Sequence, residues 1–199
     1  MIKKFLLPAL LLLPVLQTAA AQGLSSDEMK KQILESGSRM ESIVCDFVQT
    51  KTMSLLDEKM VSTGKMTYVS PDVLAWEYSS PVNYAFRMKG STVSLERDGA
   101  LETFDVNGNK MIREIARLIM GSIAGNSISD ENAFSTSVED AGGEWIVTMV
   151  PKRKEAMKLW SSLVLHFSPE RRCATGFVMN ETSGDVTAID FKNITTTFK

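Results

Sequence analysis

Apolar and polar residues alternate along most of this chain, and the clearest alternation lies within residues 64–81. Side chains that recur with a period of two share one face of a β-strand. Proline cannot donate to a strand ladder and pushes the preceding residue toward extended geometry, so Pro71 and Pro81 mark corners. The window therefore predicts two strands joined by a tight corner. The apolar face of this pair consists of Met66, Tyr68, Leu74, Trp76 and Tyr78.

The same alternation continues on both sides of this window and is broken at short polar turns. Asp98-Gly99 between two alternating runs is a strong hairpin signal. Strands joined by such short turns are antiparallel neighbours. We expect about eleven strands, over residues 44–53, 60–69, 74–78, 84–88, 93–95, 101–104, 134–139, 145–150, 159–167, 172–181 and 186–194.

Two segments have helical periodicity instead. The first starts at Ser25 or Ser26, is followed by the acidic pair Asp27 and Glu28, and fades near residues 36–38. The second spans residues 110–124, where apolar side chains recur at helical spacing and charged side chains fall on the other face. We expect this second helix to be a lid, and the alternative is a helix fixed permanently on the sheet. The lid residues are Met111, Ile112, Ile115, Leu118 and Ile119.

These elements together predict an α+β fold. A long antiparallel meander that is interrupted by a helix has one concave face on which the helices can pack. We therefore expect a curved antiparallel sheet that forms an incomplete, half-open β-barrel with helices lidding its concave face.

The N-terminus has the features of a secretory signal peptide. Lys3 and Lys4 precede an apolar run over residues 5–16, and three alanines occupy positions 19–21. We expect cleavage after Ala21, which leaves residues 22–199 as one domain. No cysteine lies near this site, so the new N-terminus is not expected to carry a lipid. The mature protein is expected to be soluble, periplasmic and monomeric.

Charge and reactive side chains narrow the function classes. Two of the 22 basic residues are removed with the signal peptide, so the mature chain has fewer basic residues than its 24 acidic ones. Because no basic run is interleaved with aromatic residues, nucleic acid is not an expected partner. His166 is a lone histidine on a strand, so we predict no catalytic residue, no metal site and no cofactor. Cys45 and Cys173 either pair in the oxidising periplasm or remain buried apolar groups, and spacing does not decide between these.

Four segments resemble the LolA family of outer-membrane lipoprotein carriers. The central pattern is Gly-x-Met-x-Tyr-x-x-Pro-x-x-Leu-x-Trp-x-Tyr-x-x-Pro over residues 64–81. The other similar segments are residues 47–51, 147–152 and 184–193. The chain departs from the family at Ser70, where well-studied carriers have a latching arginine, and after Gly90, where an aromatic, proline-containing run is missing. The C-terminal extension of some members is also expected to be absent, because Lys199 follows soon after the last similar segment.

The resemblance implies a cavity for acyl chains on the concave face. Met side chains can repack around a ligand of no fixed shape, although the same residues can instead be the ordinary packed face of the sheet. The implied partners are acylated lipoproteins, an inner-membrane ABC-type lipoprotein-releasing complex and an outer-membrane acceptor. The candidate cavity residues are Phe47, Met66, Tyr68, Leu74, Trp76, Tyr78, Phe86 and Met88.

Three further possibilities stay open. The same half-barrel occurs in periplasmic modules that sense lipids or lipoproteins, which is the main alternative function. A secreted hydrolase is the second possibility, although the sequence contains no recognisable set of nucleophile, base and orienting residue. The basic residues Lys152, Arg153, Lys154 and Lys158 form either a solvated turn or a surface for anionic headgroups or an acidic partner.

Overall fold

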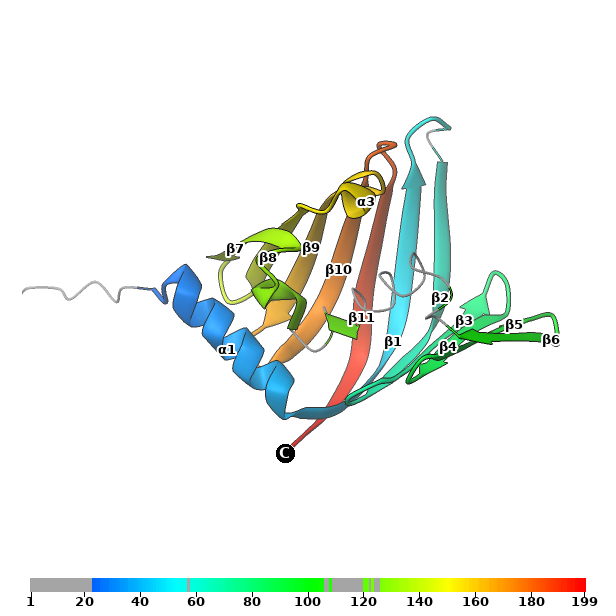
Figure 1. Ribbon diagram of the computed structural model, residues 1–199, viewed down its shortest axis with the longest axis horizontal. Coiled ribbons are helices and arrows are strands. Elements are labelled where there is room, and N and C mark those ends of the chain that lie inside the picture. Colours follow the sequence, from blue (N-terminus) through cyan, green and yellow to red (C-terminus); the bar gives the residue numbers. More distant parts are fainter. Residues whose placement is uncertain (1–22, 57, 106–107, 109–119, 122, 124–125) are drawn as a thin grey trace, which may run out of the picture.

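The computed structural model describes residues 23–56, 58–105, 108, 120–121, 123 and 126–199. Its main feature is one antiparallel sheet of eleven strands (Figure 1). The strands are β1 (Met40–Met53), β2 (Glu58–Val69), β3 (Val73–Ser80), β4 (Tyr84–Lys89), β5 (Thr92–Arg97), β6 (Ala100–Asp105), β7 (Phe134–Asp140), β8 (Trp145–Pro151), β9 (Trp160–Ser168), β10 (Cys173–Glu181) and β11 (Val186–Phe198). The helices are α1 (Ser26–Arg39), the 3-10 helix η2 (Asn126–Ser129) and α3 (Lys154–Met157).

Two series of hairpins meet at the centre of the sheet. The strand order is β6-β5-β4-β3-β2-β1-β11-β10-β9-β8-β7, so β1 and β11 join the two series. Their register places Phe47 opposite Phe191. The outer strands β6 and β7 do not pair with each other, and the sheet stays open. The predicted half-open antiparallel architecture is confirmed.

The corners predicted from proline also form. Ser70-Pro71 and Ser80-Pro81 are cis peptide bonds that end β2 and β3. The Ser70 backbone N–H donates to the Glu41 carbonyl at 2.8 Å, which ties this corner to the start of β1.

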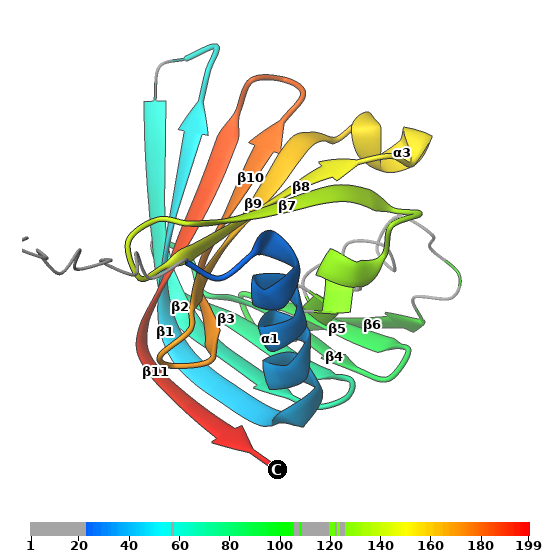
Figure 2. The ribbon, with the colours of Figure 1, turned by 90° about the vertical axis from the view of Figure 1, so that its left-hand side faces the viewer.

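Helix α1 lies on the concave side of the sheet, where the strands curve around it (Figure 2). Of the two helix starts that the sequence allows, Ser25 is the N-cap and forms a capping box with Glu28. The helix continues to Arg39 rather than fading at residues 36–38, because burial of Met29 and Ile33 outweighs the low helix propensity of that segment. α1 contacts η2, β7 and β10, so it covers one end of the concave face.

The basic residues before β9, expected in a turn, include the start of the short helix α3, whose first residue is Lys154. The signal peptide and the five lid residues lie outside the described residues and stay predictions. The lid residues are Met111, Ile112, Ile115, Leu118 and Ile119.

The core fills the space between the sheet and α1. Ile33 from the helix and Ile43, Met66, Leu74 and Val147 from the sheet are all fully buried. No helix in the described ranges has the length and apolar character needed to cross a membrane.

Candidate functional site

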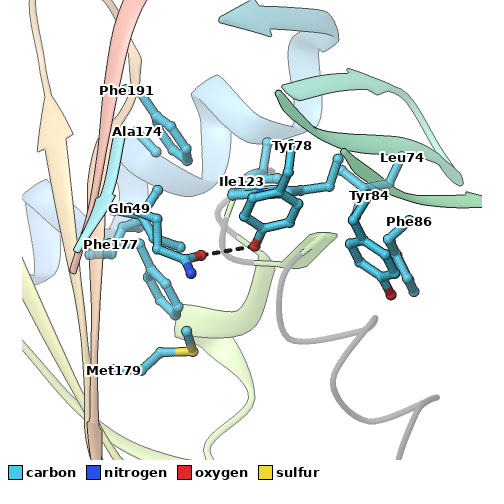
Figure 3. Close-up of a pocket in the computed structure, with 13 residues that line it drawn as sticks. Gln49, Leu74, Tyr78, Tyr84, Phe86, Ile123, Ala174, Phe177, Met179 and Phe191 are labelled. Atoms are coloured by element: carbon cyan, nitrogen blue, oxygen red, sulfur yellow. Dashed lines mark hydrogen bonds between the residues drawn. The ribbon is translucent and has the colours of Figure 1, made fainter. Parts of the chain in front are cut away.

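An apolar cavity of about 240 Å³ lies on the concave face (Figure 3). One side is formed by β3 and β4 and the other by β9, β10 and β11, so side chains from both hairpin series face one another across it. Gln49 of β1 and Ile123, which precedes η2, complete the wall. The lining residues are Gln49, Leu74, Trp76, Tyr78, Tyr84, Phe86, Ile123, Leu165, Ala174, Phe177, Met179, Ile189 and Phe191.

The eight candidate cavity residues divide into two groups of four. Leu74, Trp76, Tyr78 and Phe86 line the cavity. The other four are buried in the core and do not belong to the lining: Phe47, Met66, Tyr68 and Met88. Contact between any of the eight and an acyl chain remains a prediction.

Phe47 does not line the cavity but packs against two residues that do. Its ring centroid lies 4.8 Å from that of Trp76 and 5.0 Å from that of Tyr78. Gly64 is the cross-strand neighbour of both Phe47 and Tyr78. A Cβ atom at Gly64 would lie only 2.6 Å from Cζ of Phe47, so the missing side chain leaves the space that the ring occupies.

Polar groups in the wall are few and lie near Tyr78. Its hydroxyl donates to Gln49 Oε1 at 2.9 Å, a bond visible in Figure 3. Burial raises the pKa of Tyr78, and the nearby Trp76 indole and Gln49 amide partly offset that effect. Trp76 Nε1 is itself buried and makes no hydrogen bond with the described part of the chain. The Tyr78–Gln49 bond links β3 to β1, and the Trp76 indole N–H beside it has no acceptor among the described residues.

Sequence reasoning missed the half of the wall that comes from the C-terminal hairpins. Phe177 and Met179 alternate on β10, and Leu165 lies on β9, so a strand period was present in the sequence. That period does not tell which strands face one another. Gln49 was also missed, although it lies two residues after Phe47 and therefore shares its strand face.

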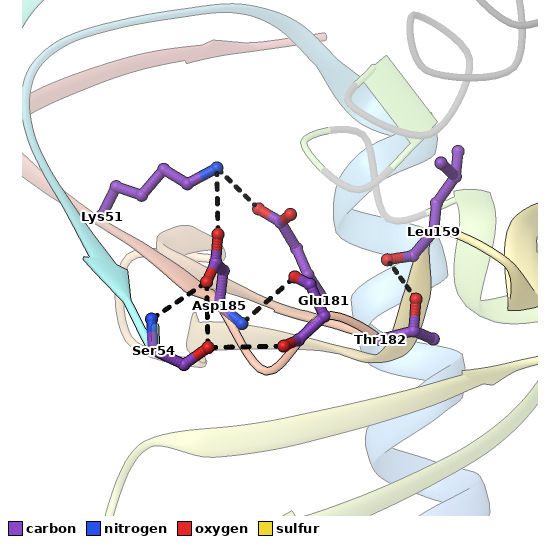
Figure 4. A network of polar contacts seen from close by, with 7 residues as sticks. Lys51, Ser54, Leu159, Glu181, Thr182 and Asp185 are labelled. Atoms are coloured by element: carbon purple, nitrogen blue, oxygen red, sulfur yellow. Dashed lines mark hydrogen bonds and ion pairs between the residues drawn. The ribbon is translucent and has the colours of Figure 1, made fainter. Parts of the chain in front are cut away.

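A polar network lies beyond the cavity, toward the tips of the central hairpins (Figure 4). Lys51 Nζ lies 3.1 Å from Glu181 Oε1 and 3.8 Å from Asp185 Oδ2. The Ser54 backbone N–H donates to Asp185 Oδ1 at 3.0 Å. Lys51 follows Gln49 by two residues and Glu181 follows Met179 by two, so this network shares the face of the cavity. It bounds the apolar wall with charged groups at that end.

A second polar cluster lies on the other face of β9. The Glu144 carboxylate is 3.0 Å from His166 Nδ1 and accepts a 2.8 Å hydrogen bond from the Thr175 hydroxyl. The contact with His166 is the main cause that holds the pKa of Glu144 below its ordinary value. The Thr175 hydroxyl faces the carboxylate and not the imidazole, so this cluster differs from a triad in which histidine takes the proton of the hydroxyl.

The two cysteines are buried and carry free thiols. Burial is the main cause that raises the pKa of Cys45 to about 12 and that of Cys173 to about 11. Thiols with such pKa values are poor nucleophiles and poor metal ligands at neutral pH. Within the described ranges, no group of three or more His, Cys, Asp or Glu side chains is placed to hold a metal ion.

An open antiparallel sheet that curves around a helix and keeps an apolar cavity on its concave side defines a LolA-like half-barrel protein. The family model for the outer membrane lipoprotein carrier protein LolA matches residues 38–199. The chain therefore belongs to this family. Membership supports a general role in binding or carrying lipoproteins.

Several solved structures are similar at low sequence identity. A LolA superfamily protein from Nitrosomonas europaea is 9% identical with a TM-score of 0.43, over 86% of this chain and 93% of that chain. Lipoprotein LppX of Mycobacterium tuberculosis is 10% identical with a TM-score of 0.47, over 85% and 96%. A chain of the Pseudomonas aeruginosa MucA/MucB complex is 12% identical with a TM-score of 0.41, over 86% and 56%. No curated protein matches. Family membership rests on the family model and not on these distant structures.

Proposed function

We propose that this protein is a periplasmic carrier that shields the acyl chains of lipoproteins during transfer from the inner to the outer membrane. The observation that carries the proposal is the apolar cavity between the two hairpin series. Each methylene moved from water into an apolar site gains about 0.8 kcal/mol, so acyl chains cross an aqueous compartment only when a protein covers them.

The size of the cavity adds a condition. Pockets for small molecules measure roughly 300–1,000 Å³, and this one measures about 240 Å³. A lipoprotein with more than one acyl chain therefore requires the cavity to widen. Partly exposed wall residues such as Tyr84, Phe86 and Met179 are the ones that can move at small cost, because they are not packed on all sides.

The proposal includes processing and partners. Residues 1–21 are removed during export, and residues 22–199 form the carrier domain, which acts as a monomer. An inner-membrane ABC-type releasing complex supplies acylated lipoproteins, and an outer-membrane acceptor receives them. N-terminal sequencing of periplasmic material is expected to start at Gln22, and a retained leader would contradict this part.

A paired substitution tests the carrier role. Phe86→Glu places a carboxylate in the cavity wall, where it resists desolvation and repels an acyl chain. Leu101→Glu is the matched control, because Leu101 lies on β6, in the same hairpin series as Phe86, and is 65% exposed. We expect Phe86→Glu to abolish transfer of an acylated lipoprotein to acceptor vesicles while urea unfolding remains cooperative, and we expect Leu101→Glu to transfer normally. Normal transfer by folded Phe86→Glu protein would reject the carrier role, and lipid binding without transfer would favour the sensing module.

A further inference from the structure

Three loops gather at one end of the sheet, at the top of Figures 1 and 2. They are the β1–β2 hairpin (residues 54–56 and 58–61), the β10–β11 turn (residues 182–185) and the segment around α3 (residues 152–159), and we call them the rim. Ser54 Oγ donates to the Ser183 carbonyl at 3.3 Å. Thr182 Oγ1 donates to the Lys158 carbonyl at 2.8 Å, and its N–H donates to the Leu159 carbonyl. The hydroxyl also lies 3.4 Å from the Leu159 carbonyl, the contact drawn in Figure 4. These bonds connect the three loops in one continuous surface.

The rim exposes large apolar side chains. Leu55 is 93% exposed and Leu56 is 63% exposed at the tip of the β1–β2 hairpin. Single exposed apolar residues are common on protein surfaces, but several that gather at one place indicate an interaction site. The exposed apolar residues of the rim are Leu55, Leu56, Met60, Val61, Met157 and Leu159.

One of the three loops of the rim, the segment around α3, is cationic, whereas the β1–β2 hairpin carries Glu58 beside Lys59 and the β10–β11 turn carries Asp185. Residues 152–158 contain Lys152, Arg153, Lys154 and Lys158 against the single acidic residue Glu155, in a chain whose net charge is −2. The three lysines are exposed, whereas Arg153 forms an ion pair with Asp130 at 3.3 Å. Long cationic side chains beside exposed apolar ones are typical of surfaces that lie on anionic bilayers, where each cation near the surface contributes about 1 kcal/mol.

The shape of the rim favours a bilayer over a protein groove as its partner. Leu55 is 93% exposed at a hairpin tip, and the fluid acyl region of a bilayer can deform to surround such a projecting side chain. The rim also lies at the end of the cavity where Gln49 and Met179 precede the Lys51–Glu181 ion pair. A bilayer at this position would meet the end of the cavity that is bounded by charged groups.

We propose that the rim docks on an anionic lipid bilayer, with Leu55 and Leu56 inserted among the acyl chains and the lysines of residues 152–158 on the headgroups. This docking goes beyond the carrying of cargo, since it requires no lipoprotein in the cavity. It does not require a specific protein receptor either.

Sedimentation with vesicles tests the proposal. The processed protein without cargo is mixed with phosphatidylcholine vesicles that contain or lack phosphatidylglycerol. We expect binding to the anionic vesicles that weakens with salt. Leu55→Asp is expected to lower the partition coefficient about tenfold or more, and Lys154→Gln about fivefold on anionic vesicles only. Leu101→Asp is the matched control, because Leu101 is also exposed but lies on β6, away from the rim.

Insertion has a direct readout. In a Leu55→Trp variant, the indole emission is expected to shift to the blue and to be quenched by lipids brominated on their acyl chains. Phe86→Glu is expected to retain vesicle binding even if it loses cargo transfer, which separates docking from the carrier role. Equal partition of wild type, Leu55→Asp and Leu101→Asp, or the absence of vesicle binding together with capture by an acidic protein, would overturn the proposal.

Discussion

Gly64 is the position where one methyl group is expected to disturb the cavity wall most. A Cβ atom there would lie 2.6 Å from Cζ and 2.8 Å from Cε1 of Phe47, and it would come even closer to the backbone carbonyl of Glu77. The carbonyl belongs to the β2–β3 ladder and cannot move without loss of strand pairing. Gly64→Ala must therefore separate the two strands or push the Phe47 ring away from Trp76 and Tyr78.

The size of the effect follows from three terms. Overpacking in a dense core costs roughly 1–3 kcal/mol. Weakening one of the aromatic contacts of Phe47 costs ~0.5–1.5 kcal/mol more. The lower entropy of the unfolded alanine chain returns about 0.4–1 kcal/mol. We therefore expect Gly64→Ala to lower the free energy of unfolding by about 2 kcal/mol, within a range of roughly 0.5–4 kcal/mol.

Urea unfolding followed by circular dichroism measures this change, and binding of an apolar fluorescent probe reports the shape of the cavity. Gly176→Ala in β10 is the comparison, because its Cβ would lie 3.0 Å from the Ile189 carbonyl and needs a smaller shift. Gly23→Ala is the control, since nothing lies within 4 Å of that site. If Gly64→Ala matched Gly23→Ala in stability and wild type in probe binding, the close approach of β2 and β3 at Phe47 would be wrong.

Three further predictions concern charge, thiols and the first helix. Glu144→Gln is expected to destabilise the protein at neutral pH, because folding lowers the pKa of Glu144 from its ordinary value of 4.5. The stability that the carboxylate contributes is therefore fully present above pH 4.5 and is lost as the pH falls through the folded pKa. Urea midpoints of both proteins should converge at low pH, and a constant difference would contradict a stabilising contact between Glu144 and His166. Cys45 and Cys173 should resist iodoacetamide in the folded protein and add two alkyl groups in urea without reductant, as measured by intact mass; unreactive thiols in urea would indicate a disulfide. Ser25→Ala should cost about 1 kcal/mol through loss of the capping box, whereas an unchanged urea midpoint would mean that α1 does not depend on its cap.

Local patterns in the sequence were enough to predict the strands of the sheet and the face that Leu74, Trp76 and Tyr78 share on β3. Alternation with a period of two assigns each side chain to a face, and tight turns pair consecutive strands, so the eleven antiparallel strands follow from the sequence alone. Leu74, Trp76 and Tyr78 share one face for the same reason. The capping box at Ser25 is likewise a local signal, because its two hydrogen bonds join residues only three positions apart.

Only the tertiary structure decided what each face meets. Pairing of β1 with β11 joins segments far apart in the chain, and no local pattern contains that register. This pairing brings Phe177 and Met179 across from Tyr78. The curvature of the sheet also packs Phe47 of β1 against Tyr78 of β3, two strands away, and places Gln49 within hydrogen-bonding distance of Tyr78. A strand period encodes a direction but not the neighbour in that direction, which is why cavity wall and packed core look alike in sequence and differ only once the sheet has curved.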